Sequence, residues 1–397
     1  MKRVWLASLL LATAFLSVDA EGAESWRAIE QAARGQRVYF NAWAGDPAIN
    51  RYISWTADVV ARRYGVTLVH VKLSDTVSAV SRILAEKAAG RVRDGSVDLI
   101  WINGENFASL MREQLLYGPW ADLAPGSRLL DERNPSVRVD FSIPTDGFEL
   151  AWGGARFTLF YDARAVGASV PAEPRSLLHW IDAHPGRFTY PQPPDFLGTS
   201  FLKQLLLVMV SDRERLRKPV GDDFEAVTQP LWTWLEAARP RLWRAGRIYP
   251  RSGAEQRRLL GDGEVDWAVS FNPSEANRAM LAGELPAGIR AIHFRNGVLG
   301  NSHFLAIPFN ARAKEGAMVV ANFLLSPEAQ VRKADEAIWG DPTVLGMAHL
   351  SHDERARFAA LKAGPATPRL EGPLLSEPHP TWTTALERGW IRRFGAQ

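Results

Sequence analysis

The feature that most constrains the fold is a strand–helix unit that occurs three times between residues 37 and 114. In each unit, a short run rich in β-branched and aromatic residues precedes a segment with apolar residues at helical spacing. The units predict strands over residues 38–41, 66–73 and 97–102, and helices over residues 49–64, between Asp75 and Gly90, and over 106–114. Strands that alternate with helices of this length favour a parallel sheet covered by helices, which is the α/β class.

A second α/β series follows a connection rich in Pro, Gly and Asp over residues 118–147. Two extended runs, 148–152 and 157–161, flank Gly153 and Gly154 and lead into it. We expect helices over 176–183, 200–211, 224–238, 254–261 and 274–282, strands over 187–190, 246–249 and 265–271, and a last helix over 382–394. Two domains are expected for a chain of 397 residues.

The first 20 residues resemble a secretory signal peptide. Lys2 and Arg3 precede an apolar run over residues 4–16, and Val18 and Ala20 occupy the positions that a signal peptidase reads. The run is shorter than the roughly 17 to 25 residues that a membrane-spanning helix needs. We therefore expect residues 1–20 to be removed; the alternative is a buried N-terminal helix.

Composition excludes several classes of protein. The chain has no cysteine, which excludes disulfides, thiolate metal sites, cysteine nucleophiles and a lipid-bearing cysteine after the signal. Lys and Arg total 47 against 44 Asp and Glu, so the net charge of +3 supplies no field that would attract nucleic acid or an acidic membrane. A secreted, unanchored, cysteine-free protein fits the bacterial periplasm.

The loops that follow the predicted strands have an uneven composition. In open parallel sheets, ligands collect beyond the carboxyl ends of the strands, where loops and helix N-termini converge. The expected loops contain no Lys or Arg, but they supply four acids and five aromatic rings: Asp46, Glu105, Asp195, Glu275, Trp43, Phe107, Phe196, Phe271 and Phe304. Because aromatic faces attract cations, this composition suits a cation or a polar ring better than an anion.

Eight residues are candidates for ligand contact: Trp43, Asp46, Asn103, Glu105, Trp152, Ser200, Asn272 and Asn301. The acids would supply counter-charge, and the amides can both donate and accept hydrogen bonds. Each candidate has an ordinary alternative. The tryptophans can fill a core, the asparagines can form turns, the acids can be solvated, and Ser200 with Thr199 can cap an apolar helix.

Other motifs point weakly to other chemistry. Ser200 and Lys203 match the S-x-x-K signature of secreted serine hydrolases and acyl-transferases, but the accompanying S-D-N and K-T-G elements are absent. His349 and His352 form the only close histidine pair, and no third metal ligand accompanies them. We therefore expect neither an enzyme nor a metal site nor a cofactor, and keep the serine hydrolase as an alternative.

Several segments resemble the bacterial extracellular solute-binding proteins of ABC importers, specifically the two-lobed type that includes spermidine/putrescine, thiamine and ferric-ion binders. Besides the signal, they are VYFNAWAG (38–45), VDLIWINGENF (97–107), WGGARFTLFYDARAV (152–166), YPQPPDFLGTSFLKQLL (190–206), EVDWAVSFNPSEA (264–276) and, most specifically, FLAIPFNARAKEGAMVVANFLLSPEAQ (304–330). The resemblance covers most of residues 37–335.

The resemblance implies a two-lobed periplasmic-binding-protein fold of type II, with a ligand cleft that closes on a hinge between the lobes. Lobe 1 would hold residues 37–152 plus 298–335, and lobe 2 residues 160–296 plus 340–397. It also implies a protein, expected to be a monomer, that delivers a small polar solute to an ABC permease in the inner membrane. The loop composition favours an organic cation such as thiamine or a polyamine; a sugar or a carboxylate stays open.

Overall fold

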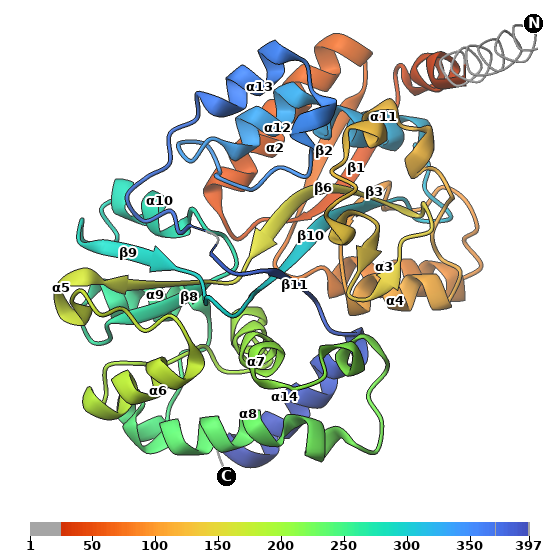
Figure 1. Cartoon of the computed structure of the whole chain (residues 1–397). Coiled ribbons are helices and arrows are strands. Elements are labelled where there is room, and N and C mark those ends of the chain that lie inside the picture. The colour runs from red at the N-terminus through yellow and green to blue at the C-terminus, as the bar shows by residue number, and fades with distance from the viewer. Residues whose placement is uncertain (1–24, 370, 396–397) are drawn as a thin grey trace, which may run out of the picture.

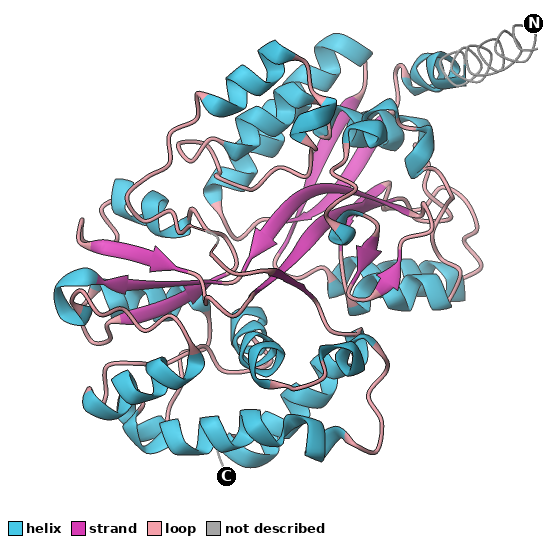
Figure 2. Ribbon diagram, in the orientation of Figure 1, coloured by secondary structure: helices cyan, strands magenta, loops and turns pink. Residues whose placement is uncertain are grey.

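The computed structural model describes residues 25–369 and 371–395. The predicted signal peptide lies outside them. After helical residues 25–33, the chain builds a six-stranded sheet and a separate three-stranded sheet, each flanked by helices (Figures 1 and 2). Among the described residues, no helix combines the length and the apolar character that crossing a bilayer requires.

The first sheet has the path β11-β10-β3-β1-β2, and β6 pairs with the other edge of β10. Its strands are β1 (Arg37–Trp43), β2 (Thr67–Leu73), β3 (Leu99–Ile102), β6 (Glu149–Arg156), β10 (Val298–Ala306) and β11 (Leu374–Ser376). β1 is parallel to β2 and β3, as the three repeated units predict, whereas β10 runs antiparallel to β3 and β6. β6 continues through Gly153 and Gly154, where the sequence suggested an interruption.

Helices cover both faces of this sheet (Figure 1). They are α2 (Pro47–Tyr64), α3 (Val77–Ala88), α4 (Glu105–Arg112), α11 (Lys314–Leu324), α12 (Pro327–Ala334) and α13 (His352–Ala359). Gly65 ends α2 in the left-handed conformation, with φ of 67°, as the glycine after the predicted helix indicated. A short hairpin, β4 (Val139–Asp140) and β5 (Ile143–Pro144), rises from the long connection.

The second sheet has the order β8-β7-β9, and β7 is antiparallel to both neighbours. Its strands are β7 (Thr158–Asp162), β8 (Trp267–Ser270) and β9 (Ile289–Ile292). The helices around it are α5 (Ala163–Val166), α6 (Pro174–Ala183), α7 (Phe196–Met209), α8 (Phe224–Ala238), α9 (Gly253–Gly261), α10 (Glu275–Leu281) and α14 (Pro380–Phe394).

Two of the predicted strands were wrong. Residues 187–190 form no ladder because their carbonyls bond to separate segments: Arg187 accepts from Asp266, and Phe188 accepts from Trp243. Residues 246–249 begin with Gly246 at a φ of 60°, a left-handed conformation that a strand does not contain. Buried apolar residues produced both predictions, because a buried irregular segment has the same composition as a buried strand.

The hydrophobic residues form two large clusters on either side of the β6–β7 and β10 crossings. The first core packs β1, β2, β3 and α11 with residues up to Leu350, and the second packs β7, α7, α8 and α14. The tail 340–397, which we assigned to lobe 2, is therefore divided. Val344, Leu345 and Leu350 pack in the first core, and β11 then carries the chain across to the second, where Trp382 and Trp390 are buried.

Candidate functional site

The candidate site lies where the two cores face each other. The carboxyl ends of the parallel strands β1, β3 and β6 lie at one edge of the first sheet, with the N-terminal ends of α2 and α4 beside them. The N-terminal ends of α7 and α10 come from the second core. Strand ends and helix N-termini converge in this way at the ligand sites of open α/β sheets.

A buried ion pair forms the floor of this site. The Nζ atom of Lys203, two turns into α7, lies 2.6 Å from Oε2 of Glu377, and the two side chains are 2% and 1% exposed. Asn301 of β10 donates from Nδ2 to Oε1 of Glu377 over 3.0 Å. The ammonium of Lys203 also lies 4.6 Å from the ring centre of Phe141 and 6.0 Å from that of Phe196.

The β4–β5 hairpin closes over this pair with a strained turn. Its two central residues, Phe141 and Ser142, have φ of 42° and 66°, a left-handed conformation that costs roughly 1–2 kcal/mol per non-glycine residue. The Ser142 hydroxyl donates to the backbone carbonyl of Glu377 over 2.8 Å, and the Asp140 carboxylate accepts from the Gly104 amide over 2.6 Å. The turn therefore ties the first core to the C-terminal segment.

Carboxyl groups outnumber cations around the floor. Glu387 of α14 accepts a hydrogen bond from the Thr199 hydroxyl over 2.9 Å, and Glu105 is exposed at the start of α4. Burial raises the pKa of Asp140, Glu377 and Glu387, and the charge of Glu105 raises the pKa of each of them further. Lys203 lowers the pKa of Glu377, but burial has the larger effect. Four carboxyl groups thus share one ammonium.

Three polar atoms in this cluster have no hydrogen-bond partner among the described residues: Oδ1 of Asp140, Oδ1 of Asn301 and Oγ of Ser200. Each belongs to a side chain that is at most 7% exposed. They come from three separate elements: the hairpin, β10 and α7.

The other side of the site is electrically balanced. Asp46 accepts from the amide of Ala48, which caps α2, and its other oxygen lies 2.5 Å from Nη1 of Arg278 on α10. Glu275 pairs with Arg257 at 2.5 Å. Two of the loop acids that suggested a cation therefore have arginine partners, and a third, Asp195, caps α7 through the amides of Leu197 and Gly198. Glu105 has no ion pair among the described residues.

The remaining candidates are scattered. Trp43 ends β1 with its ring over Gly45 and is 39% exposed. Asn103 is half-buried, and Asn272 accepts from the Ser274 amide, the turn role that was the alternative. Trp152 is fully buried in the first core, where its ring packs against Trp101 and Trp339, the core-filling role that was its alternative.

The serine hydrolase alternative lacks its geometry. Ser200 is fully buried, its hydroxyl has no hydrogen-bond partner among the described residues, and Lys203 is engaged by Glu377 rather than by Ser200. A nucleophilic serine needs a base within hydrogen-bond reach. The sequence also suggested that Ser200 and Thr199 cap α7. They do not, because Asp195 caps that helix one turn earlier.

Sequence reasoning missed Glu377, Glu387, Phe141 and Asp140. The first two lie in and near the proline-rich tail, and the other two lie in the connection over 118–147, regions with little periodicity. The left-handed Phe–Ser turn left no signal, because such turns usually contain Asn or Gly. The S-x-x-K match did indicate Lys203, although for another chemistry.

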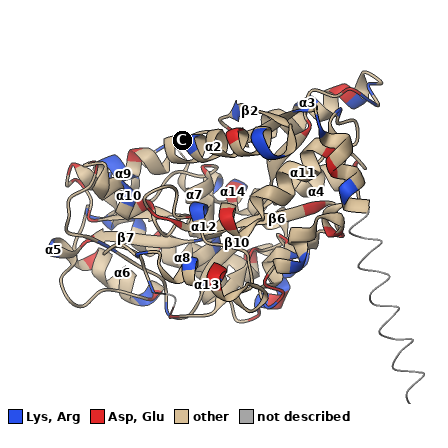
Figure 3. Ribbon diagram, turned by 90° about the horizontal axis from the view of Figure 1, so that it is seen from above, with Lys and Arg blue, Asp and Glu red and all other residues tan. Residues whose placement is uncertain are grey.

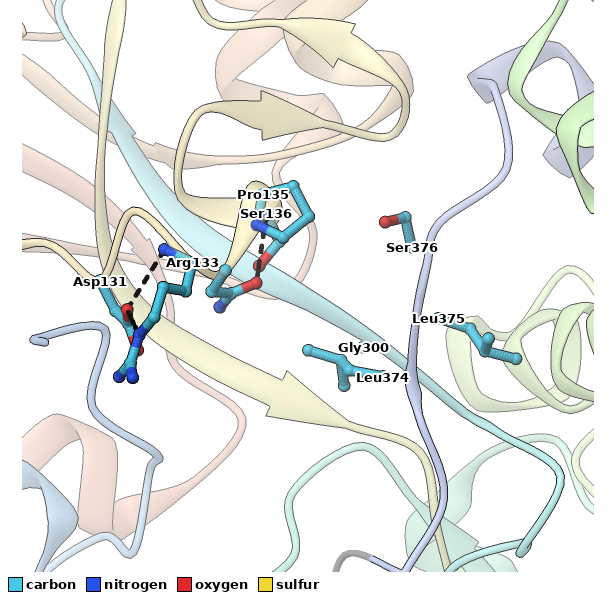
Figure 4. Close-up of a pocket in the computed structure, with 9 residues that line it drawn as sticks. Asp131, Arg133, Pro135, Ser136, Gly300, Leu374, Leu375 and Ser376 are labelled. Atoms are coloured by element: carbon cyan, nitrogen blue, oxygen red, sulfur yellow. Dashed lines mark hydrogen bonds and ion pairs between the residues drawn. The ribbon is translucent and has the colours of Figure 1, made fainter.

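A hollow of about 410 Å³ is lined in part by Gly300 and Ser376 (Figure 4). These two residues directly precede Asn301 and Glu377 of the floor in the sequence. Arg133 and Asp131 line it and pair with each other at 2.9 Å. The hollow therefore offers no uncompensated charge. Basic and acidic residues are also interspersed along the whole molecule, in keeping with its small net charge (Figure 3).

Known proteins share sequence features and the fold with this chain. A family model described as bacterial extracellular solute-binding protein matches residues 55–353. Protein YnjB of Escherichia coli (strain K12) is 45% identical over 392 residues, which cover 98% of each chain.

Solved structures share the fold at low sequence identity. The periplasmic binding protein AfuA from Actinobacillus pleuropneumoniae, with fructose-6-phosphate bound, matches with a TM-score of 0.62 at 13% identity over 91% of this chain and 100% of its own. The spermidine/putrescine substrate-binding protein PotD from Streptococcus pneumoniae matches with a TM-score of 0.62 at 12% identity over 91% and 98%. The two-lobed α/β fold predicted from the sequence is confirmed.

Proposed function

The chain belongs to the family of bacterial extracellular solute-binding proteins, and from this premise we propose that it captures a small organic cation between its two lobes. Its family and fold are those of the solute-binding components of ABC transporters, which work with a membrane permease. The family also places the protein outside the cytoplasm. Removal of residues 1–20, the absence of a lipid anchor and a monomeric state remain part of the proposal.

The observation that carries the cation proposal is the excess of carboxyl groups over the single ammonium of Lys203 at the site floor. Glu105 and Glu387 have no cationic partner there, and Glu105 is open to solvent. Opposite charges within a few ångströms of a carboxylate favour its ionised form, so a solute cation would gain from this site. Thiamine and polyamines are candidates of this kind, and PotD is named for spermidine and putrescine.

The proposed mechanism is a population shift between open and closed lobes. Lobe 1 would hold residues 37–152 and 298–335, and lobe 2 residues 160–296 with α14. Asp46 with Arg278, and Ser142 with Glu377, connect segments that pack in different cores. A solute that contacts both sides adds to these contacts and favours closure. No covalent step is proposed.

A carboxylate or a sugar is the second candidate, and Arg156 is the observation that favours it. This half-buried residue ends β6, and its guanidinium has no hydrogen bond or ion pair among the described residues. Burial and the charge of Arg156 lower the pKa of the neighbouring His293 to about 4. A carboxylate would neutralise Arg156.

A thermal-shift screen of the mature protein tests the proposal. We expect stabilisation by putrescine, spermidine or thiamine, and none by glucose, galactose, glutamate or citrate. A midpoint shift of several degrees at 100 times the dissociation constant corresponds to about 2.7 kcal/mol of added stability. Stabilisation by carboxylates or sugars alone would overturn the cation assignment and leave Arg156 as the residue to test.

A further inference from the structure

The three unpartnered atoms at the site floor restrict the chemistry of the solute. Oδ1 of Asp140 and Oδ1 of Asn301 are acceptors, and Oγ of Ser200 can accept or donate. Leaving a buried polar atom without a partner costs about 1–3 kcal/mol. Such atoms are rare in folded proteins and mark places where a ligand, ion or water completes the hydrogen bonding. The missing groups here are mostly donors.

The three atoms belong to elements that pack in both cores. Asp140 is held by the Gly104 amide in the first core, Asn301 lies on the crossing strand β10, and Ser200 lies on α7 in the second core. Lys203 does not supply the missing donors, because its ammonium is paired with Glu377. Glu105 and Glu387 add charge without adding a donor.

Resting on the proposed function, we infer that the solute carries a protonated primary or secondary amine, whose N–H groups donate to Asp140 and Asn301 and whose charge faces Glu105 and Glu387. A quaternary ammonium or a thiazolium ring carries the charge but no N–H at the cationic nitrogen, so it leaves these acceptors unpartnered. A sugar hydroxyl donates a hydrogen bond but brings no charge. Amines therefore fit this floor better than thiamine-like cations or sugars.

Binding of an ammonium would change the ionisation of Asp140. Burial raises its pKa, and the charges of Glu377 and Glu105 raise it further, whereas Lys203 lowers it. An ammonium at its second oxygen would lower the pKa again, since an adjacent opposite charge favours the ionised carboxylate.

The test compares putrescine with its permethylated, bis-quaternary analogue by isothermal titration calorimetry on the mature, unlabelled protein. We expect putrescine to bind at least tenfold more tightly than the analogue. Asp140→Asn keeps an oxygen for the Gly104 amide and puts an NH₂ group in place of the free oxygen, so putrescine affinity should fall at least tenfold. Glu105→Gln, at an exposed position that folding tolerates, should lower it about threefold to tenfold.

The matched control is Glu113→Gln, which changes an exposed glutamate just past the other end of α4 and should leave the affinity unchanged. Equal binding of putrescine and its quaternary analogue would overturn the amine assignment but leave the cation proposal standing. Binding of sugars or carboxylates alone would overturn both. Absence of any amine binding at millimolar concentration would also overturn the inference. Unchanged putrescine affinity in both Asp140→Asn and Glu105→Gln would show that the amine does not bind at this floor.

Discussion

Two lysine–carboxylate pairs are buried in the part of the chain that the structure describes, and their surroundings differ. Lys333 lies 2.7 Å from Oδ2 of Asp341 inside the first core, and it also donates to the carbonyl of Trp152. The rings of Trp152 and Trp339 lie 5.1 and 5.5 Å from its ammonium, and His303 holds the other oxygen of Asp341 at 3.0 Å. Both carboxylate oxygens and the ammonium therefore have partners.

The Lys203–Glu377 pair is equally buried but lies between the two cores, with additional carboxyl groups and three unpartnered atoms around it. The two acids respond in opposite directions. Burial raises the pKa of Asp341, but Lys333 and His303 outweigh it and hold the pKa below its usual value. For Glu377, burial outweighs Lys203 and the pKa is raised. We interpret the first pair as structural and the second as part of a site that a ligand completes.

The largest expected effect is on stability. Lys333→Met should lower the free energy of unfolding by about 3–5 kcal/mol, because it leaves a buried, ionised Asp341 without its main partner. Lys203→Met should cost only about 1–3 kcal/mol, because Glu377 can take up a proton and keep its bond from Asn301. Urea denaturation at neutral pH measures both. Equal losses would contradict the distinction between the pairs.

The next effect is on ligand affinity. Lys203→Met should raise the affinity for putrescine about tenfold, because a bound ammonium can then supply the counter-charge that Glu377 has lost and release the proton that Glu377 takes up in the free variant; tenfold corresponds to about 1.4 kcal/mol. Lys333→Met, wherever it remains folded, should leave the affinity unchanged and serves as the control. Calorimetry on both variants decides the matter, and a loss of affinity in Lys203→Met would place the anionic part of a ligand at this lysine.

The opposite pKa shifts predict opposite pH dependences. The folded pKa of Asp341 is depressed, so its contribution is present above the unfolded value near 4 and is lost as the pH falls through the lower, folded value. The folded pKa of Glu377 is raised, so its contribution is unfavourable at neutral pH and improves as the pH falls through that raised value.

Denaturation of the wild-type protein, Asp341→Asn and Glu377→Gln between pH 7 and pH 3 measures these contributions. Each unit of pKa shift is worth about 1.4 kcal/mol. The free energy of unfolding of the wild-type protein should exceed that of Asp341→Asn by less in acid than at neutral pH. Relative to Glu377→Gln, the free energy of unfolding of the wild-type protein should rise as the pH falls. Parallel profiles for the two variants would show that the pairs do not differ.

The smallest expected effect concerns the aromatic ring at the mouth of the site. Phe196 is 48% exposed, and its ring lies 5.2 Å from that of Phe271. Phe196→Leu should weaken putrescine binding about twofold to fivefold, since an exposed cation–π contact is worth about 0.5–1 kcal/mol. Val92→Ala, at an exposed apolar residue before the amino end of β3, is the control and should change nothing.

Much of the fold could be predicted from the sequence because it depends on local patterns. The periodicity of residues 37–114 gave the parallel strands β2, β1 and β3 in the right places, and α8 spans the predicted residues 224–238. The failures lie where burial was not periodic, as at residues 187–190, or where the chain changes its packing partner, as in the tail after Ile338.

The site was harder to predict, because charge balance is decided through space. The sequence by itself determined the α/β class, the family and the positions of the acids in the strand-end loops. Only the tertiary structure decided which acids stay uncompensated: Asp46 meets Arg278 across 232 positions of sequence, and Glu377 meets Lys203 across 174. The interaction energy of a carboxylate depends on the distance to its partner and on the burial of both groups. The local sequence around the carboxylate determines neither quantity.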